Sequence, residues 1–358
     1  MIINKKRITW IELLRIAACI GVIGIHAGSQ HFRDVPVNTS VWQVSNFYHG
    51  INRFAVACFI MISGSLYLSS KRTWDLKKLW MKNILPVASA YLFWQLFYGF
   101  YRIAVNGSPK IGSMEFFKKM MVYVSEPYFH LWYLPMLIGL LVITPLIWEI
   151  VNSPRGKQWS QYMILLFLIF QIFTYTAGRF DLPWKEHVQN LMNTVHPELV
   201  TGYVGYFVLG HYLYEYGLPK KIERMVCILG PVMILAGIWL CRQESLASGK
   251  ATQAFYENYT IFACIWSTAV FLFFKEYVSK IQWSERMEKM ICSLGGCTFG
   301  IYLIHAFVRD VLYRNGIDSM MMRNTILAIP FVMGLIFLIS WGIVFIAEKV
   351  PFIKKWIM

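Results

Sequence analysis

Charged residues are scarce in this sequence, and acidic residues are scarcer than basic ones. Only 15% of the 358 residues are charged, whereas about a quarter are charged in an ordinary soluble domain. The 34 Lys and Arg residues outnumber the 19 Asp and Glu residues, which gives a net charge of +15. The basic residues flank apolar segments and do not form one stripe. We therefore reject a nucleic-acid partner and favour basic loops beside a lipid bilayer.

Cysteine patterns typical of a metal site or a disulfide framework are also missing. The seven cysteines lie in or at the ends of apolar segments, and none forms a Cys-x-x-Cys pair. We expect them to pack as small hydrophobic side chains, with no metal ion. A cleavable signal peptide is not expected either, because Glu12 and Arg15 interrupt the first apolar run.

Apolar runs are what the sequence does contain, since 57% of its residues are hydrophobic. Helices in lipid satisfy their own backbone polar groups, and a span needs about 20 apolar residues. We predict an all-α polytopic membrane protein with about ten transmembrane helices in one bundle, forming a single domain over residues 1–358 without a separate soluble domain. The predicted spans are 8–28, 45–68, 83–105, 130–150, 160–178, 199–216, 225–242, 256–275, 293–313 and 324–347.

The basic residues of the loops predict how these spans are oriented. With the N-terminus inside, twenty basic residues fall on the inner side and ten on the outer side. Inner loops of membrane proteins carry the excess of Lys and Arg. We therefore predict that both chain termini are cytoplasmic, and that an inner loop carries Lys77, Lys78 and Lys82.

The first predicted span carries its polar residues on one face. At about 100° per residue, Arg15, Cys19 and His26 lie about 300°, 340° and 320° from Glu12. Charged residues in a span usually face the bundle interior or a polar cavity. Arg15 and His26 are about 16 Å apart along the helix axis, so they could contact opposite ends of one elongated ligand. Structural pairing is the alternative for any one of these residues alone.

His26 also lies inside the sequence Gly24-Ile25-His26-Ala27-Gly28. This small-xxx-small pattern lets another helix approach closely. Simple packing is the more common meaning of such a pattern. Here we expect the packing to fix the height of the imidazole as well.

Several polar residues are predicted to lie near the outer ends of their spans. They are His26, Arg53, His130, Trp132 and His305. Glu12 and Arg15, in contrast, lie in the inner half of the first span, near the basic loop. A basic inner mouth and an outer histidine cluster suit an anionic cytoplasmic ligand.

These residues belong to four short motifs. Arg15 is followed by His26 after ten intervening residues, with Glu12 just before it. The second motif begins at Arg53 and ends in Phe-x-x-x-Ser-Gly at 59–64. The third reads His-Leu-Trp-Tyr-Leu at 130–134, and the fourth reads Phe-Gly-Ile-Tyr-Leu-Ile-His at 299–305. In this order they resemble the acyltransferase 3 family of integral-membrane acyltransferases, over most of the chain.

The sequence departs from the family's pattern at two places. The family usually has Asp where Glu12 stands. Many members carry an arginine pair at the start of the third helix, where this sequence has Lys77, Lys78 and Lys82. Lysine neutralises phosphate but lacks the bidentate fork of arginine.

The resemblance implies an enzyme that transfers acyl groups other than aminoacyl groups. The expected donor is cytoplasmic acyl-coenzyme A, most often acetyl-coenzyme A, which acts as a substrate and not as a tightly bound cofactor. The expected acceptor is a hydroxyl of a cell-surface glycan or a lipid-linked sugar. Through the family, the expected location is a bacterial cell membrane.

The resemblance also implies roles for individual residues. His26 would act as general base on the acceptor hydroxyl, or would carry the acyl group transiently. Arg53 would stabilise the oxyanion. Substrate contacts are expected from Glu12, Arg15, His130, Trp132 and His305, and contacts with the donor's phosphates from Arg15, Lys77, Lys78 and Lys82. An interfacial position for Trp132 and a structural role for His305 are equal alternatives.

Two other functions fit a polar interior. A transporter of a glycan or small anion explains it as well as catalysis does, but predicts paired half-helices in related repeats, which the sequence does not show. A membrane sensor or partner module with a degenerate site is the third interpretation. Turnover of labelled acyl-coenzyme A by purified protein would separate all three.

Overall fold

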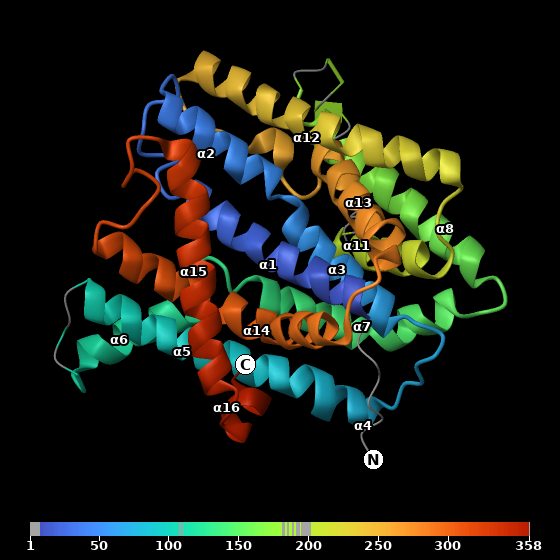
Figure 1. The fold of residues 1–358 in the computed structure, drawn as a ribbon, viewed down its shortest axis with the longest axis horizontal. Coiled ribbons are helices and arrows are strands. Elements are labelled where there is room, and N and C mark those ends of the chain that lie inside the picture. Colours follow the sequence, from blue (N-terminus) through green and yellow to red (C-terminus); the bar gives the residue numbers. More distant parts are fainter. Residues whose placement is uncertain are drawn as a thin grey trace. The chain divides into compact units, whose positions relative to one another are not determined.

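The computed structural model of this protein describes residues 8–106, 109, 111–180, 183–184, 186–187, 190, 194 and 202–357. Within these ranges the chain is helical and contains no strand (Figure 1). Some residues used in the predictions lie outside the described part: residues 199–201 of the sixth predicted span, and Lys5, Lys6, Arg7, Lys110 and Lys185 of the charge count.

Eight helical segments of the described part are long and apolar enough to cross a membrane. They are Thr9–Gly28, Ser40–Tyr67, Tyr133–Val151, Gly156–Ala177, Lys220–Ser248, Ala254–Lys280, Glu285–Arg314 and Thr325–Ala347. Each coincides with a predicted span. The other two predicted spans fall on α5 (Leu85–Val105), which is 21 residues long but contains Gln95 and Arg102, and on α11 (Gly202–Glu215), which has 14 residues. The chain is therefore an all-α, multi-pass membrane protein, as the sequence predicts.

The chain divides into two compact units. The first comprises Met1–Ser70 and Trp148–Trp341, and the second comprises Lys71–Ile147 and Gly342–Met358. Helices α7 (Tyr133–Val151) and α15 (Thr325–Ala347) each run from one unit into the other.

The first unit is built around α1 (Thr9–Gly28), which packs against α2 (Ser40–Ile51), α3 (Phe54–Tyr67), α13 (Ile261–Glu276) and α14 (Glu285–Arg314). The remaining elements of this unit are α8 (Gly156–Leu166), the π-helix η2 (Phe167–Phe173), α9 (Thr174–Ala177), α11, α12 (Lys220–Ser248) and the short 3₁₀ helices η4 (Ala254–Tyr256) and η5 (Val278–Lys280). In the most apolar stretch of α1, 67% of the residues are buried. In the corresponding stretch of α12, only 28% of the residues are buried. Polar groups on α1 therefore face protein, while much of α12 is left for lipid.

The second predicted span is not one continuous helix. It breaks at Asn52 and Arg53, between α2 and α3. The side chain of Asn52 donates to the carbonyl of Tyr48 at 2.7 Å, and the N–H of Arg53 bonds to the carbonyl of Gly50 at 3.0 Å. Asn side chains compete with the helical backbone in this way. Irregular backbone at membrane depth is tolerated where it is enclosed by protein or lines a cavity.

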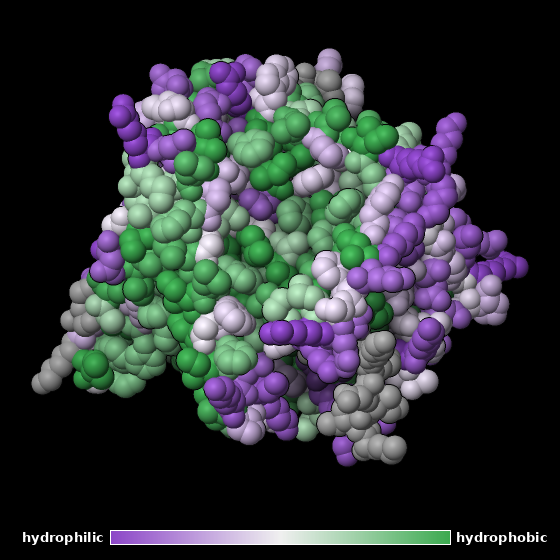
Figure 2. All heavy atoms as spheres, viewed as in Figure 1, coloured by the Kyte–Doolittle hydropathy of each residue, from purple (hydrophilic) through white to green (hydrophobic). Residues whose placement is uncertain are grey.

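The lipid-facing character of α15 follows from its sequence. Its exposed apolar side chains within the first unit include Ile326, Leu327, Phe331, Leu338 and Ile339. Figure 2 shows apolar side chains gathered along this helix. A helix that is apolar on all sides suits a position against lipid.

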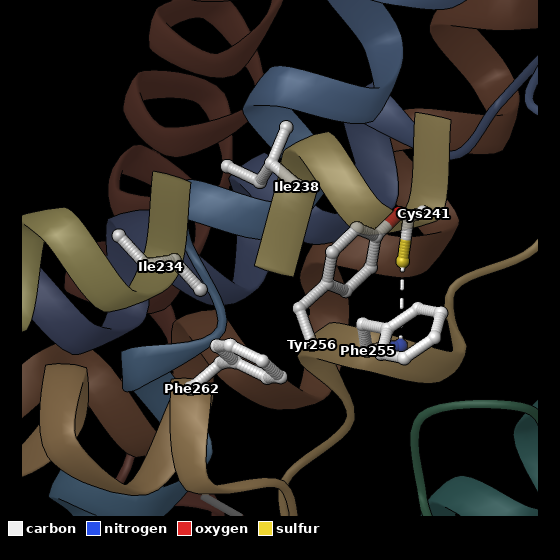
Figure 3. Close-up of a cluster of buried hydrophobic side chains, with 6 residues drawn as sticks. All are labelled: Ile234, Ile238, Cys241, Phe255, Tyr256 and Phe262. Carbon is white, nitrogen blue, oxygen red and sulfur yellow. Dashed lines mark hydrogen bonds between the residues drawn. The ribbon is translucent and has the colours of Figure 1, made fainter. Parts of the chain in front are cut away.

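A buried cluster fixes the segment between α12 and α13. It contains Ile234, Ile238 and Cys241 of α12, Phe255 and Tyr256 of η4, and Phe262 of α13 (Figure 3). The N–H of Phe255 donates to the sulfur of Cys241 at 3.3 Å. Because η4 is held against α12, the positions of Gln253 and Tyr256 are fixed as well.

The second unit has its own packing. It contains α4 (Leu76–Leu79), the π-helix η1 (Trp80–Ile84), α5, α6 (Met114–Ser125), most of α7 and α16 (Pro351–Trp356). The amide nitrogen of Gln95 on α5 lies within hydrogen-bond distance of three carbonyl oxygens at the end of α6 and just beyond it, of which that of Glu126 is nearest at 2.9 Å. Ser89 and Trp94 bond to the carbonyls of Trp356 and Ile357, which ties α16 to α5.

Candidate functional site

The glycines that flank His26 bring α1 against the break between α2 and α3. A Cβ on Gly24 would lie 2.5 Å from the amide nitrogen of Asn52. A Cβ on Gly28 would lie 3.1 Å from the backbone nitrogen of His49. The close approach predicted from the small-xxx-small pattern is therefore confirmed, and it places His26 beside the only described break in this span.

His26 is stacked on His305 of α14. The two ring centroids are 5.3 Å apart, and the ring planes differ by 26°. His305 is 1% exposed, and its Nδ1 lies 2.6 Å from the carbonyl oxygen of Tyr302. Because a carbonyl oxygen can only accept, Nδ1 of His305 carries a proton. The sequence predicted that these two histidines lie at one level, and the structure brings them into contact.

Arg53 precedes the first turn of α3, at the break in the span. Its Nη2 donates to Nε2 of His49 at 2.8 Å and to Oε1 of Gln253 at 2.7 Å. Its guanidinium carbon also lies 5.4 Å from the centroid of the Tyr256 ring. These contacts hold a positive charge in one orientation, since the single nitrogen Nη2 bonds both acceptors and the ring of Tyr256 lies beside the planar guanidinium.

A chain of hydrogen bonds continues from Arg53 into the buried cluster. Because Arg53 donates to Nε2 of His49, a neutral His49 carries its proton on Nδ1, which lies 3.3 Å from the oxygen of Tyr256. The hydroxyl of Tyr256 donates to Asn46 at 2.9 Å, and the amide of Asn46 donates to the carbonyl of Ile238 at 3.1 Å. Every donor in this chain points away from Arg53, so the bonds polarise one another.

His26 and Arg53 line one cavity of about 420 Å³. Its other lining residues are Ile25, Ser29, Gln30, Phe32, Arg33, Asp34, His49 and Gln253. This volume lies within the range of small-molecule sites, which is about 300–1,000 Å³. An imidazole and a fixed guanidinium therefore meet at a space where a reacting group could be bound. We call it the histidine cavity.

Glu12 and Arg15 lie at the opposite end of α1 and do not line the histidine cavity. Nη1 of Arg15 forms an ion pair with Oε1 of Glu12 at 2.9 Å. Glu12 is buried against α14, where a Cβ on Gly295 would lie 2.3 Å from its carboxylate. Cys19, between the two ends, contacts the carbonyl of Thr298 at 3.8 Å. The polar residues of α1 thus lie on one face, as their spacing predicts, and Glu12, Cys19 and His26 contact α14.

His130 and Trp132 belong to the second unit. His130 is 2% exposed, and its ring lies 5.1 Å from that of Tyr98 and 5.7 Å from that of Tyr128. Tyr98 and Tyr128 are themselves stacked at 4.2 Å. Trp132, in contrast, is 38% exposed. His130 is therefore enclosed by aromatic rings, while Trp132 presents a surface.

The three lysines assigned to the donor's phosphates are also in the second unit. Lys77 and Lys78 lie on α4, Lys82 lies on η1, and all three are exposed. The backbone N–H of Lys78 donates to Asp75 and, with the Lys78 ammonium 3.4 Å away, lowers the pKa of that carboxyl below its usual value. Lys78 is thus partly neutralised, whereas no such ion pair is found for Lys77 and Lys82 among the described residues.

Three residues of the site were missed from the sequence: His49, Gln253 and Tyr256. His49 precedes Arg53 by four residues, a spacing that puts both side chains on one helix face. That spacing was the available signal. Gln253 and Tyr256 lie about 200 residues further along the chain, at the two ends of a segment (253–256) that carries no motif.

Comparison with known proteins agrees with this architecture. The acyltransferase 3 family model, whose description is an acyltransferase domain, matches residues 8–345. No curated protein and no solved structure matches the chain at a significant level. The match covers nearly the whole length of the chain and includes every residue that lines the histidine cavity. The chain therefore belongs to the acyltransferase 3 family of membrane acyltransferases.

Proposed function

We propose that this protein transfers an acyl group, most often acetyl, from cytoplasmic acyl-coenzyme A to a hydroxyl of a cell-surface glycan or a lipid-linked sugar. The observation that carries this proposal is the histidine cavity. There, His26 and Arg53 face one space of about 420 Å³ that is large enough for a thioester and a hydroxyl.

His26 acts in this proposal as the general base. It takes the proton from the acceptor hydroxyl as the oxygen attacks the thioester carbonyl carbon. The tetrahedral intermediate collapses, the carbon–sulfur bond breaks, and the thiolate leaves and takes up the proton. The stacked ring of His305 limits rotation of His26, which keeps its nitrogen aimed at the reacting oxygen. An acyl-histidine intermediate is the variant of this mechanism.

Arg53 stabilises the oxyanion. Both of its hydrogen bonds to His49 and Gln253 start from Nη2. Its Nε–H is buried and has no hydrogen-bond partner among the described residues. A buried donor of this kind is costly unless something accepts from it. An oxyanion in the cavity would supply that acceptor, and a preorganised donor contributes most where charge develops.

The remaining site residues contact the substrates in this proposal. Arg15 meets the anionic part of coenzyme A from the inner end of α1. Lys77, Lys78 and Lys82 are proposed as further contacts with its phosphates. Glu12, whose ion pair partly neutralises Arg15, is proposed as a substrate contact beside it. His130 and Trp132 are proposed as contacts of the acceptor. The single acyltransferase domain over residues 1–358 remains part of the proposal.

The proposal is tested with purified protein in lipid vesicles and acetyl-coenzyme A labelled in its acetyl group. We expect label to appear in a glycan acceptor extracted from the membrane, with release of free coenzyme A in equal amount. Transport of the donor or glycan without any covalent transfer of label would contradict the proposal and favour a transporter.

A further inference from the structure

A second group of polar and aromatic side chains lies next to the histidine cavity, and the reaction proposed above does not use it. It comes from the end of α9 and the residues just beyond, from the start of α11, and from the loop between η4 and α13. Its members are Tyr175, Arg179, Tyr203, Glu257 and Tyr259. We call this group the tyrosine cluster.

Two links connect the tyrosine cluster to the histidine cavity. Gln253 lines the cavity and accepts from Arg53 at 2.7 Å, and Glu257 lies at the other end of η4, the short helix that Gln253 precedes. Glu257 and Tyr203 also lie within electrostatic range of Arg53. If one part of an extended ligand is bound at the cluster, the adjoining part of the same ligand would therefore lie at the cavity.

The three tyrosine rings contact one another. The Tyr259 ring centroid lies 4.9 Å from that of Tyr203 and 6.0 Å from that of Tyr175. All three side chains are partly exposed. Together the three rings form one continuous surface that presents aromatic faces and hydroxyl groups.

An ion pair lies against this surface. Nη2 of Arg179 contacts Oε2 of Glu257 at 2.9 Å, and the guanidinium carbon lies 4.3 Å from the centroid of the Tyr175 ring. The hydroxyl of Tyr175 also donates to the Glu257 carboxylate. The two side chains are 31% and 30% exposed, so planar donors and acceptors remain accessible. Their charges cancel, which leaves the cluster neutral.

Asn258 adds an acceptor next to the rings. Its amide nitrogen donates to the hydroxyl of Tyr203 at 3.2 Å. Its side-chain oxygen is buried and has no hydrogen-bond partner among the described residues. A bound hydroxyl would satisfy this oxygen, whose unpaired burial is otherwise unfavourable.

We propose that the tyrosine cluster binds a neutral sugar ring of the acceptor, next to the ring whose hydroxyl reacts. A sugar ring has apolar C–H faces that pack on aromatic rings, and rows of hydroxyls that both donate and accept. The ion pair and Asn258 supply matching acceptors and donors. Because the cluster is neutral, it favours uncharged sugars over uronates or phosphates. This inference rests on the proposed function, since it names the class of acceptor.

The binding test uses the full-length protein in detergent without any acyl donor. Saturation-transfer NMR would be recorded with methyl glycosides of glucose, galactose, N-acetylglucosamine and rhamnose, and with methyl glucuronide as the anionic comparison. We expect saturation transfer to at least one neutral glycoside and less to the glucuronide. Binding of no neutral glycoside, or of the glucuronide alone, would overturn the proposal.

Variants assign the binding to the cluster. Glu257→Gln removes the negative charge and leaves Arg179 unneutralised, so neutral sugars should bind at least about tenfold more weakly while the glucuronide gains affinity. Tyr259→Ala should also weaken binding about tenfold, and Tyr259→Phe should keep most of it because the stacking face remains. Tyr277→Ala is the matched control, since Tyr277 is a 47% exposed tyrosine outside the cluster. Wild-type affinities in folded Glu257→Gln and Tyr259→Ala proteins would overturn the proposal.

The outcomes also separate this inference from the proposed function. Sugar binding that depends on the cluster, in a protein that transfers no acyl group, would support the inference and contradict the transferase mechanism. Acyl transfer whose acceptor KM is unchanged by Glu257→Gln would support the transferase and overturn the inference.

Discussion

The two ends of α1 carry related groups in opposite surroundings. At one end, Arg15 is neutralised by Glu12 at 2.9 Å, and Glu12 is buried against Gly295. At the other end, His26 is stacked on His305 and faces a cavity of about 420 Å³. One helix face thus carries an ion pair packed against α14 at one end and lines a cavity at the other. Spacing along a helix identifies such a face, but the neighbouring helices decide what each end does.

The roles proposed for the two ends of α1 require that the Arg15 end faces the cytoplasm. The test of this orientation gives one of two opposite results. If the Arg15 end is cytoplasmic, reporter fusions should place Met358 in the cytoplasm and the loop 106–128 outside, as the twenty-to-ten charge asymmetry predicts. Alkaline phosphatase and fluorescent-protein fusions measure this directly. If Met358 were found outside, the Arg15 end of α1 would face away from the cytoplasm. Arg15 could then not meet a cytoplasmic donor.

Replacing His26 should give the largest effect on rate. General-base catalysis contributes about 10²–10⁴-fold, so both His26→Ala and His26→Gln should lower kcat by that factor while donor binding is retained. Gln keeps a polar side chain but cannot take the proton. The control is His187→Gln, which changes an exposed histidine elsewhere. A folded His26→Gln protein with near-normal transfer would reduce His26 to a packing residue.

Replacing Arg53 should lower kcat by about 10²–10³-fold, the usual effect of removing an oxyanion donor. Arg53→Lys is the sharper variant because it keeps the charge. Lysine can offer one nitrogen to His49 and Gln253, as Nη2 does, but it lacks the second donor, the Nε–H assigned to the oxyanion, so most of the loss should remain. Steady-state kinetics with saturating donor measure this. Full activity in Arg53→Lys would show that charge alone is sufficient.

At the inner end, Arg15→Ala should act on donor binding and not on chemistry. Loss of a charge-assisted contact weakens donor binding by about 1.5–3 kcal/mol and leaves acceptor affinity unchanged. Glu12→Gln provides the opposite change, since it frees Arg15 from its partner and should strengthen donor binding. Separate titrations of the two substrates decide the matter. Unchanged donor affinity in both variants would make the pair purely structural.

The smallest effect is expected from the hydrogen-bond chain behind Arg53. Tyr256→Phe removes the hydroxyl that joins His49 to Asn46, which should cost about 0.5–1.5 kcal/mol in transition-state stabilisation. The loss should appear in kcat while the donor KM stays constant, because Tyr256 acts only through His49 and Arg53. His49→Gln should reproduce the effect. An equal loss of donor binding would indicate a general change in packing.

Much of the fold could be predicted from hydropathy, because lipid imposes length and apolarity on each span. The shared polar face of α1 followed from helical spacing, and the close approach at Gly24 and Gly28 from the small-xxx-small pattern. The common level of His26 and His305 followed from the order and alternating direction of the predicted spans. The break between α2 and α3 did not. It depends on the side chain of Asn52 and on close packing of Gly50 against Ile238, and such tertiary contacts leave no periodic signal in the sequence.

The partners of Arg53 were hidden for a related reason. Gln253 reaches Arg53 because the buried cluster fixes η4 against α12, two hundred residues away in the sequence. Only a folded chain brings those segments together. The roles assigned to His130, Trp132 and the three lysines stay predictions, because they depend on how substrates are bound and not on helix periodicity.

The most direct measurement is a structure of the protein bound to a thioether analogue of acetyl-coenzyme A that cannot transfer its acyl group. Our account predicts the acyl carbonyl carbon in the histidine cavity, with its oxygen toward Nε of Arg53 and with room for the acceptor hydroxyl between that carbon and a nitrogen of His26. The adenine and phosphates should lie toward Arg15. An acyl group bound outside the histidine cavity, with His26 and Arg53 contacting neither substrate, would contradict the account.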